Sequence, residues 1–234
     1  MIKLVVFDID GTLAGVGEPI LEENVNLLKR IEDAGCTVAL SSGKSVFYQM
    51  GMFRQVGLKN PVFIGENGCS IAFGVHLPPK VLKPVCPESV YFESRAHILE
   101  EMQSLCPDGF WLQPNEVMLT LFFRDPAVRD AMRSYFKTCR YPGITVYEHV
   151  DSFDVVPEGM DKHTGLARLC RELHIRQEEV MAVGDGVNDI PMLEFCKYSI
   201  GVGGLDSSLT TYHFDEIGEA LAFLLAFVRS PAQT

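Results

Sequence analysis

The start of the chain alternates continuous apolar runs with helix-like segments, and this rhythm restricts the possible fold more than any other feature. The apolar runs occupy residues 3–7, 36–40 and 61–65, and helix patterns occupy 22–35 and 45–58 between them. A strand that is apolar at every position is usually covered on both faces, as in a parallel sheet. The order strand, helix, strand, helix, strand therefore predicts an open α/β sheet.

The rhythm changes between about residues 70 and 155 and then resumes. This stretch contains two helix patterns, at 88–105 and from Asp125-Pro126 onward. It also contains three strand patterns, at 116–123, 144–150 and 153–157. Pro is favoured at the first position of a helix, which supports the second helix. The pattern predicts a small α+β insert in an α/β protein, with the domains 1–69, 70–155 and 156–234. The segment after the insert again alternates helices and strands, at 162–173, 179–185, 189–196, 198–202 and 216–229.

Two carboxylates, Asp8 and Asp10, directly follow the first apolar run in the sequence "FDIDGT". Asp and Gly are common turn residues, which accounts for one aspartate and the glycine. Turn formation does not account for the pair of aspartates, because neighbouring carboxylates repel unless a cation or a shared proton offsets their charge. The pair therefore points to a functional site at the end of the first strand.

Three further places in the chain present polar residues at a strand end or a helix start. They are "SSGK" at 41–44, Lys162 after the insert, and "GDGVND" at 184–189. Each alone is more often a helix cap, a surface lysine or a turn. Ligands of open α/β sheets bind at the carboxyl ends of the strands, where these residues would meet. Carboxylates suit Mg²⁺, and hydroxyls, backbone amides and lysine suit phosphoryl oxygens.

These four segments together resemble the haloacid dehalogenase (HAD) superfamily, in its Cof-type, type IIB branch. "DIDGT" is similar to motif I of that family, Ser42 to motif II, Lys162 to motif III and "GDGVND" to motif IV. The resemblance covers the whole predicted core, and "IGENG" at 64–68 also resembles this branch. It implies a Rossmann-like parallel-sheet core with an inserted α+β cap of the C2 type.

The resemblance also implies roles for individual residues. Asp8 would be the nucleophile that attacks phosphorus and forms an aspartyl-phosphate. Asp10 would protonate the leaving alkoxide and then deprotonate the attacking water. Mg²⁺ would be bound by Asp8, the backbone carbonyl of Asp10, Asp185 and Asp189.

The remaining predicted site residues would bind substrate or phosphate. They are Gly11, Thr12, Ser42, Gly43, Lys44, Lys162 and Asn188. Motif II reads Ser-Gly-Lys here, whereas Thr-Gly-Arg is common in the family. The hydroxyl group is retained, but the contact made by Lys44 stays open.

The predicted function is a Mg²⁺-dependent phosphatase that hydrolyses a small phosphorylated metabolite. Asp10 distinguishes the chain from dehalogenases and phosphonate hydrolases, which lack this acid/base. A phosphomutase of the phosphomannomutase type and a non-catalytic phosphate-binding relic are the alternatives. Receiver domains also combine Asp, Ser or Thr and Lys with Mg²⁺, but their phosphorylated Asp lies in mid-domain and their fold has no place for the insert.

The insert would select the leaving group, with Arg95, Arg124, Glu148 and His149 as candidate residues. Its hinges would lie near 65–68 and 157–159, where Gly and Pro residues cluster. It is short for the Cof-type branch and nearer in size to the caps of phosphoglycolate and sugar-phosphate phosphatases.

Composition restricts the partners and the compartment. The formal net charge of −11 argues against a broad surface for nucleic acid or anionic membrane. The seven cysteines include no C-x-x-C pair, which is typical of reduced thiols in a cytoplasmic protein. Acidic residues follow the first apolar run too early for a signal peptide, and the late run at 220–228 is too short to span a bilayer. We expect a cytoplasmic monomer or homodimer.

Overall fold

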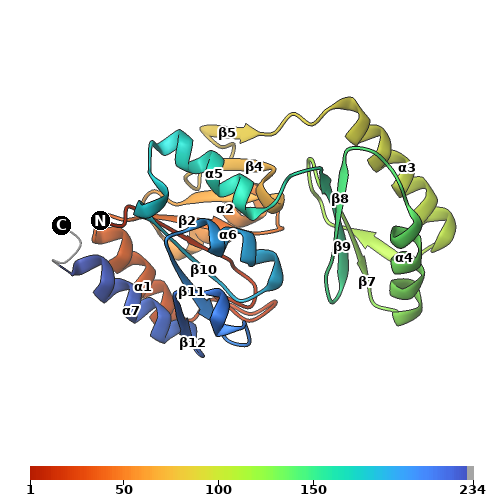
Figure 1. Cartoon of the computed structure of the whole chain (residues 1–234). Coiled ribbons are helices and arrows are strands. Elements are labelled where there is room, and N and C mark those ends of the chain that lie inside the picture. Colours follow the sequence, from red (N-terminus) through yellow and green to blue (C-terminus); the bar gives the residue numbers. More distant parts are fainter. Residues whose placement is uncertain (231–234) are drawn as a thin grey trace. The chain divides into compact units, whose positions relative to one another are not determined.

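The chain folds into two compact units in a computed structural model that describes residues 1–230 (Figure 1). Unit 1 combines Met1–Lys83 with the chain from Asp161 onward, and unit 2 is Pro84–Met160. The chain leaves unit 1 once and returns to it once, so unit 2 is a single insertion.

Unit 1 is built on an eight-stranded sheet with the order β12-β11-β10-β1-β2-β3-β4-β5. Its strands are β1 (Leu4–Phe7), β2 (Thr37–Ser41), β3 (Val62–Gly65), β4 (Ser70–Phe73), β5 (Val81–Pro84), β10 (Val180–Gly184), β11 (Tyr198–Val202) and β12 (Tyr212–Phe214). The strands from β12 to β3 pair in parallel, and β4 pairs with β3 in the antiparallel direction. Strand β1 is completely buried at the centre of this sheet.

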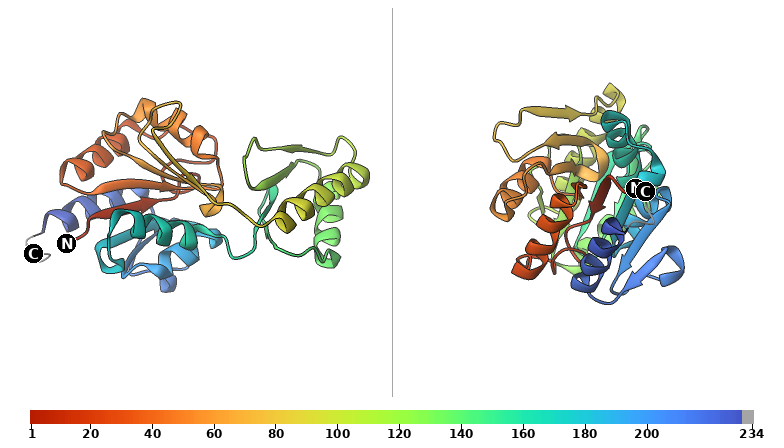
Figure 2. Two further views of the ribbon diagram at one scale, coloured as in Figure 1. Left: turned by 90° about the horizontal axis from the view of Figure 1, so that it is seen from above. Right: turned by 90° about the vertical axis from the view of Figure 1, so that its left-hand side faces the viewer.

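Helices cover both faces of the large sheet (Figures 1 and 2). They are α1 (Glu22–Asp33), α2 (Val46–Val56), α5 (Lys162–Leu173), α6 (Ile190–Phe195) and α7 (Ile217–Arg229). Because side chains alternate along a strand, Val5 and Phe7 pack with α1, α2 and α7, whereas Leu4 and Val6 pack with α5 and α6. The result is a three-layer arrangement with one hydrophobic core on each side of the sheet.

Unit 2 is a four-stranded antiparallel sheet with two helices and a core of its own. The sheet order is β6-β7-β9-β8. The elements are α3 (Ser89–Leu105), β6 (Phe110–Leu112), β7 (Leu119–Phe123), α4 (Pro126–Thr138), β8 (Ile144–Glu148) and β9 (Ser152–Pro157). Ile98 and Met102 from α3 and Met132 from α4 pack against Leu121 and Phe153 of the sheet.

The predicted α/β fold with an inserted α+β unit is confirmed. The observed division differs from the predicted insert of 70–155, because β4 and β5 extend the large sheet and belong to unit 1. The proposed hinge at 65–68 accordingly lies inside unit 1, between β3 and β4. Within residues 1–230, no helix combines the length and the apolar content needed to cross a bilayer.

Candidate active site

Three neighbouring strands of unit 1 end in residues that the sequence singles out. Asp8 follows β1, Ser42 follows β2 and Asp185 follows β10. The strands β10, β1 and β2 are adjacent and parallel, so these residues lie at one edge of the sheet.

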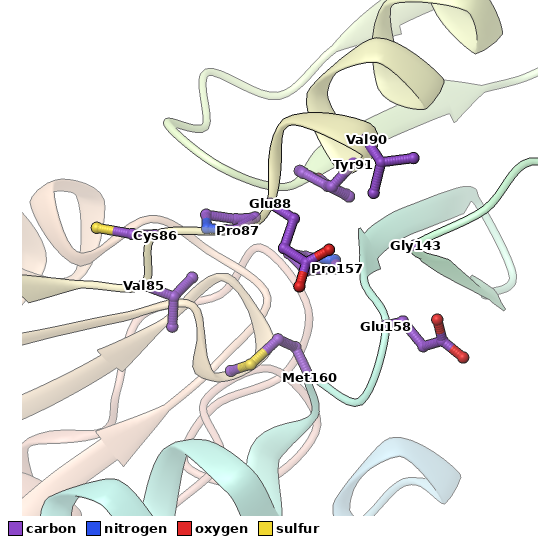
Figure 3. A pocket seen from close by; sticks show the side chains of 10 residues that line it. All are labelled: Val85, Cys86, Pro87, Glu88, Val90, Tyr91, Gly143, Pro157, Glu158 and Met160. Atoms are coloured by element: carbon purple, nitrogen blue, oxygen red, sulfur yellow. The ribbon is translucent and has the colours of Figure 1, made fainter.

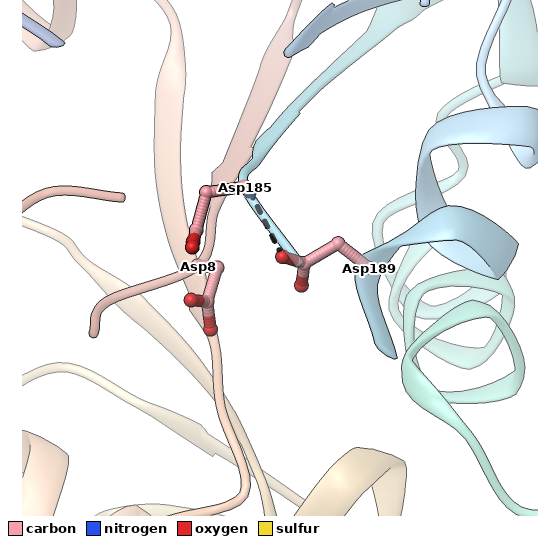
Figure 4. A group of neighbouring side chains, drawn as sticks. All are labelled: Asp8, Asp185 and Asp189. Atoms are coloured by element: carbon pink, nitrogen blue, oxygen red, sulfur yellow. Dashed lines mark hydrogen bonds between the residues drawn. The ribbon is translucent and has the colours of Figure 1, made fainter. Parts of the chain in front are cut away.

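Asp8, Asp185 and Asp189 form a cluster of carboxylates at this edge (Figure 4). One oxygen from each of the three side chains lies within 4.8 Å of the others. Asp189 is completely buried, and its Oδ2 accepts hydrogen bonds from the backbone N–H groups of Asp185 (3.1 Å) and Gly186 (3.0 Å). The loop after β10 therefore fixes the Asp189 carboxylate toward the cluster.

Lys162 provides a positive charge within the cluster. Its side chain is only 1% exposed, and Nζ donates to Oδ1 of Asp8 and to Oδ1 of Asp189, each at 2.6 Å. Lys162 is the first residue of α5, whose start is fixed because Asp161 and Thr164 form a reciprocal capping box.

Close packing of two glycines brings the start of α5 near the sheet. A Cβ atom added to Gly165 of α5 would lie 2.5 Å from the Cα of Gly68, which follows β3. Any larger residue at Gly165 would push α5 away from the sheet and Lys162 away from the carboxylates. The two glycines thus help to set the position of the lysine.

Burial and neighbouring charges change the protonation equilibria of this cluster. Burial, opposed by Lys162, raises the pKa of Asp8 to about 7. Burial also raises the pKa of Asp185, an effect that the hydrogen bond from Thr12 opposes. Burial disfavours the charge on Lys162, but Asp189 and Asp8 outweigh this effect and raise its pKa above the ordinary value.

The cluster fits a divalent cation bound by oxygen. Its three carboxylates face one ammonium group, which leaves an excess of negative charge in a largely buried place. Carboxylate oxygens are ligands that Mg²⁺ prefers. Asp8, Asp185 and Asp189 are therefore the residues that can hold such an ion.

The loop after Asp8 packs directly onto Asp185. Gly11 has a φ of +90°, and a Cβ atom there would collide with the Asp185 carboxylate. Thr12 Oγ1 donates to Oδ1 of Asp185 at 2.5 Å. Gly11 and Thr12 thus shape and orient the cluster, in addition to any contact with phosphate that the resemblance implies.

Asp10 is separate from the three-carboxylate cluster and pairs with another residue. Its Oδ2 accepts a hydrogen bond from Nζ of Lys44, and the two side chains are equally exposed at 27%. Ser42 is buried, and its Oγ accepts from the backbone N–H of Lys44 at 3.2 Å. The structure thus shows a contact for Lys44, which the sequence left open.

The other predicted residues lie in the loops after β2 and β10. Gly43 is between Ser42 and Lys44, and the half-buried Asn188 packs over Gly186 in the loop after β10. Sequence reasoning missed Gln49, whose buried side-chain amide donates to the backbone oxygens of Lys44 (2.9 Å) and Ile64 (3.1 Å). Its signal was a polar residue on the apolar face of the predicted helix.

A separate cavity of about 470 Å³ lies in unit 2 (Figure 3). Its lining combines apolar side chains, such as Pro157 and Met160, with Tyr91 and the carboxylates of Glu88 and Glu158. All of its lining residues belong to unit 2, so it is distinct from the carboxylate cluster.

Comparison with known proteins gives consistent results in sequence and structure. The family model of haloacid dehalogenase-like hydrolases matches residues 5–78 and 100–212. A phosphoglycolate phosphatase from Methanococcoides burtonii is 28% identical over 212 residues, which cover 88% of this chain and 86% of the relative.

Two solved structures have the same fold as this chain. A haloacid dehalogenase-like hydrolase from Bacteroides thetaiotaomicron aligns with a TM-score of 0.80 at 19% identity, over 96% of this chain and 100% of the other. A sugar phosphatase of HAD subclass IIB aligns with a TM-score of 0.70 at 17% identity, over 94% and 98% of the two chains.

Proposed function

Since this chain belongs to the haloacid dehalogenase-like hydrolases and is a phosphatase of that superfamily, we propose that it hydrolyses a small phosphorylated metabolite in a Mg²⁺-dependent reaction. The observation that carries the proposal is the carboxylate cluster of Asp8, Asp185 and Asp189 around the buried Lys162. The related phosphoglycolate phosphatase favours a phosphoglycolate-like ester as the substrate.

Asp8 is the proposed nucleophile and Asp10 the proposed acid and base. In the first step a carboxylate oxygen of Asp8 bonds to phosphorus, and the bond from phosphorus to the leaving oxygen breaks. Asp10 gives its proton to that oxygen, so an alcohol leaves and an aspartyl-phosphate remains. In the second step Asp10 takes a proton from water, whose oxygen attacks phosphorus and releases phosphate and Asp8.

The other site residues are proposed to stabilise the charges of Asp8 and of the phosphoryl group during these steps. A nucleophilic carboxylate has to be ionised. Burial raises the pKa of Asp8 to about 7, and the ammonium of Lys162 at 2.6 Å opposes this rise by favouring the ionised form. Lys162, Ser42 and the backbone of Gly43 are the proposed donors to the phosphoryl oxygens. Mg²⁺ held by Asp8, Asp185 and Asp189 would offset negative charge on the phosphoryl group.

The proposal is tested by phosphate release from p-nitrophenyl phosphate, followed by a panel that includes phosphoglycolate and sugar phosphates. We expect turnover with Mg²⁺ and its loss with EDTA. Asp8→Asn should abolish turnover with the fold intact, because an amide is nearly isosteric but a poor nucleophile. Asp10→Asn should lose about 10²–10⁴-fold, the usual worth of general acid–base catalysis. Undiminished activity of Asp8→Asn, in preparations free of other phosphatases, would contradict the proposal.

A further inference from the structure

Lys44 contacts the proposed acid and base rather than the carboxylate cluster. Its Nζ donates to Oδ2 of Asp10, and it also lies 5.7 Å from the ring centroid of Tyr48. Both charged side chains are about three-quarters buried, so the pair is shielded from much of the screening that weakens exposed ion pairs.

The backbone of Lys44 is held from three directions. Its N–H donates to Oγ of Ser42 at 3.2 Å. Its carbonyl oxygen accepts from Nε2 of Gln49 at 2.9 Å and from the backbone N–H of Glu66 at 3.1 Å. Gln49 is completely buried, and its amide also donates to the backbone oxygen of Ile64. The backbone from which the Lys44 side chain extends is therefore held to both α2 and β3.

We propose that Lys44 is a positioning residue that holds Oδ2 of Asp10, so that Oδ1 exchanges the proton with the leaving oxygen and then with water. This inference rests on the proposed function. A carboxylate can rotate about its last bond, and a fixed donor on one oxygen restricts it to orientations in which the other oxygen is the reactive one. Preorganised groups of this kind raise the rate because the transition state requires no further ordering.

This role differs in a measurable way from a phosphate-binding role for Lys44. A phosphate-binding lysine contacts the transferred group, which is the same in every substrate, so its loss should affect all substrates alike. In the first step, which kcat/KM reports, a residue that acts through Asp10 matters most when the leaving oxygen needs a proton as its bond to phosphorus breaks. Alkyl phosphates have this need, whereas the p-nitrophenolate of p-nitrophenyl phosphate leaves readily without a proton. The second step, the attack of water on the aspartyl-phosphate, is common to all substrates.

The test compares kcat/KM, which reports the first step alone, for an alkyl phosphate and for p-nitrophenyl phosphate in three variants. Lys44→Met should lower kcat/KM for the alkyl phosphate by about tenfold or more, a part of the general-acid effect, with a much smaller loss of kcat/KM for p-nitrophenyl phosphate. Lys44→Arg retains a donor and should recover most of the loss. Lys59→Met is the control, because it removes the same charge from the exposed Lys59–Asp33 pair and should leave both rates unchanged.

A double-mutant cycle with Asp10→Asn completes the test. If Lys44 acts through Asp10, Lys44→Met should cause little further loss in the Asp10→Asn background. An equal loss of kcat/KM for both substrates, no recovery in Lys44→Arg, or full additivity in the cycle would overturn the inference while the proposed function stands. A wild-type protein inactive toward every phosphomonoester would overturn the proposed function and this inference with it.

Discussion

At the scale of single residues, Lys162 connects two buried carboxylates that would otherwise repel each other. Removing one partner of a buried ion pair is costly because it leaves charge without compensation. We predict that Lys162→Met lowers the free energy of unfolding by about 3–5 kcal/mol at neutral pH. Urea denaturation measures this, with Lys83→Met as the control, because the half-exposed Lys83–Glu172 pair should be worth about 0–1 kcal/mol. Equal effects of the two substitutions would contradict the picture of a buried charge cluster.

Asp185 is the member of the cluster whose loss should weaken metal binding most cleanly. It is only half buried, so Asp185→Ala removes a ligand without opening the core. Because Mg²⁺ stabilises whatever state it binds, we predict that it raises the unfolding temperature of the wild type and that Asp185→Ala needs more Mg²⁺ for the same rise. Thermal unfolding across a Mg²⁺ titration measures this. The exposed Asp215→Ala should behave as the wild type does, and an unchanged response in Asp185→Ala would contradict the metal site.

Sequence and structure differ in what they reveal about these residues. The positions of Asp8, Lys162, Asp185 and Asp189 at strand ends and a helix start were enough to predict that they meet. The pairing of Lys44 with Asp10 was not predictable, because it depends on the path of a flexible side chain between two loops. Gln49 was missed because a single polar residue on an apolar helix face carries no information about its partner.

At the scale of elements, the long periodic segments were the most predictable. The helix patterns at 88–105 and 162–173 correspond closely to α3 and α5, and the apolar run at 36–40 to β2. The strands β4, β5, β6 and β12, each of three or four residues, were not predicted. A strand that short exists because a neighbouring strand supplies its hydrogen bonds, and that neighbour is not visible in local sequence. The strands β1 and β3 are equally short but were predicted, because they alternate with helix patterns in the rhythm of an α/β sheet.

Glu179, just before β10, connects this central strand to the chain on either side. Its Oε1 lies 2.7 Å from Nζ of Lys3, and its Oε2 accepts from the backbone N–H of Arg176 at 3.0 Å. The hydrogen bonds from Lys3 and Arg176 lower the pKa of Glu179 from the ordinary 4.5 to about 2. A lowered pKa in the folded state means that this stabilisation is complete above 4.5 and is lost as the pH falls toward 2.

We therefore predict that Glu179→Gln is less stable than the wild type at neutral pH and that the difference shrinks in acid. Urea unfolding of both proteins from neutral pH down to about pH 3.5 measures this, since the folded wild type binds fewer protons than its unfolded chain in that window. Glu178→Gln is the matched control, because the half-exposed Glu178 pairs with the exposed Arg176 guanidinium at 3.2 Å. A constant difference between Glu179→Gln and the wild type at every pH would contradict the pKa of Glu179.

At the scale of the whole molecule, the chain combines a mostly parallel sheet, which bears the carboxylate cluster, with an antiparallel unit that has a core of its own. Unit 2 contains all four residues that the sequence analysis proposed for substrate selection, and Arg124 and His149 are two of them. The Arg124 guanidinium lies 5.1 Å from the ring centroid of Trp111. His149 Nε2 lies 3.1 Å from Oδ2 of Asp154, whose Oδ1 accepts from Thr120 at 2.7 Å. Both side chains are thus held in defined orientations, as residues that recognise a ligand need to be.

We predict that Arg124→Ala and His149→Ala change the ratio of kcat/KM between phosphoglycolate and a sugar phosphate more than they change turnover of p-nitrophenyl phosphate. The physical reason is that the carboxylates of unit 1 are proposed to act on the phosphoryl group, which all substrates share, whereas the leaving groups differ. Lys137→Ala, which removes an exposed charge from α4, is the control and should leave the ratio unchanged. An alanine scan of residues 84–160 extends the measurement to the whole of unit 2. If every variant changed the rates of all substrates by one common factor, unit 2 would contribute to structure alone, and selection would have to come from the residues around the carboxylate cluster.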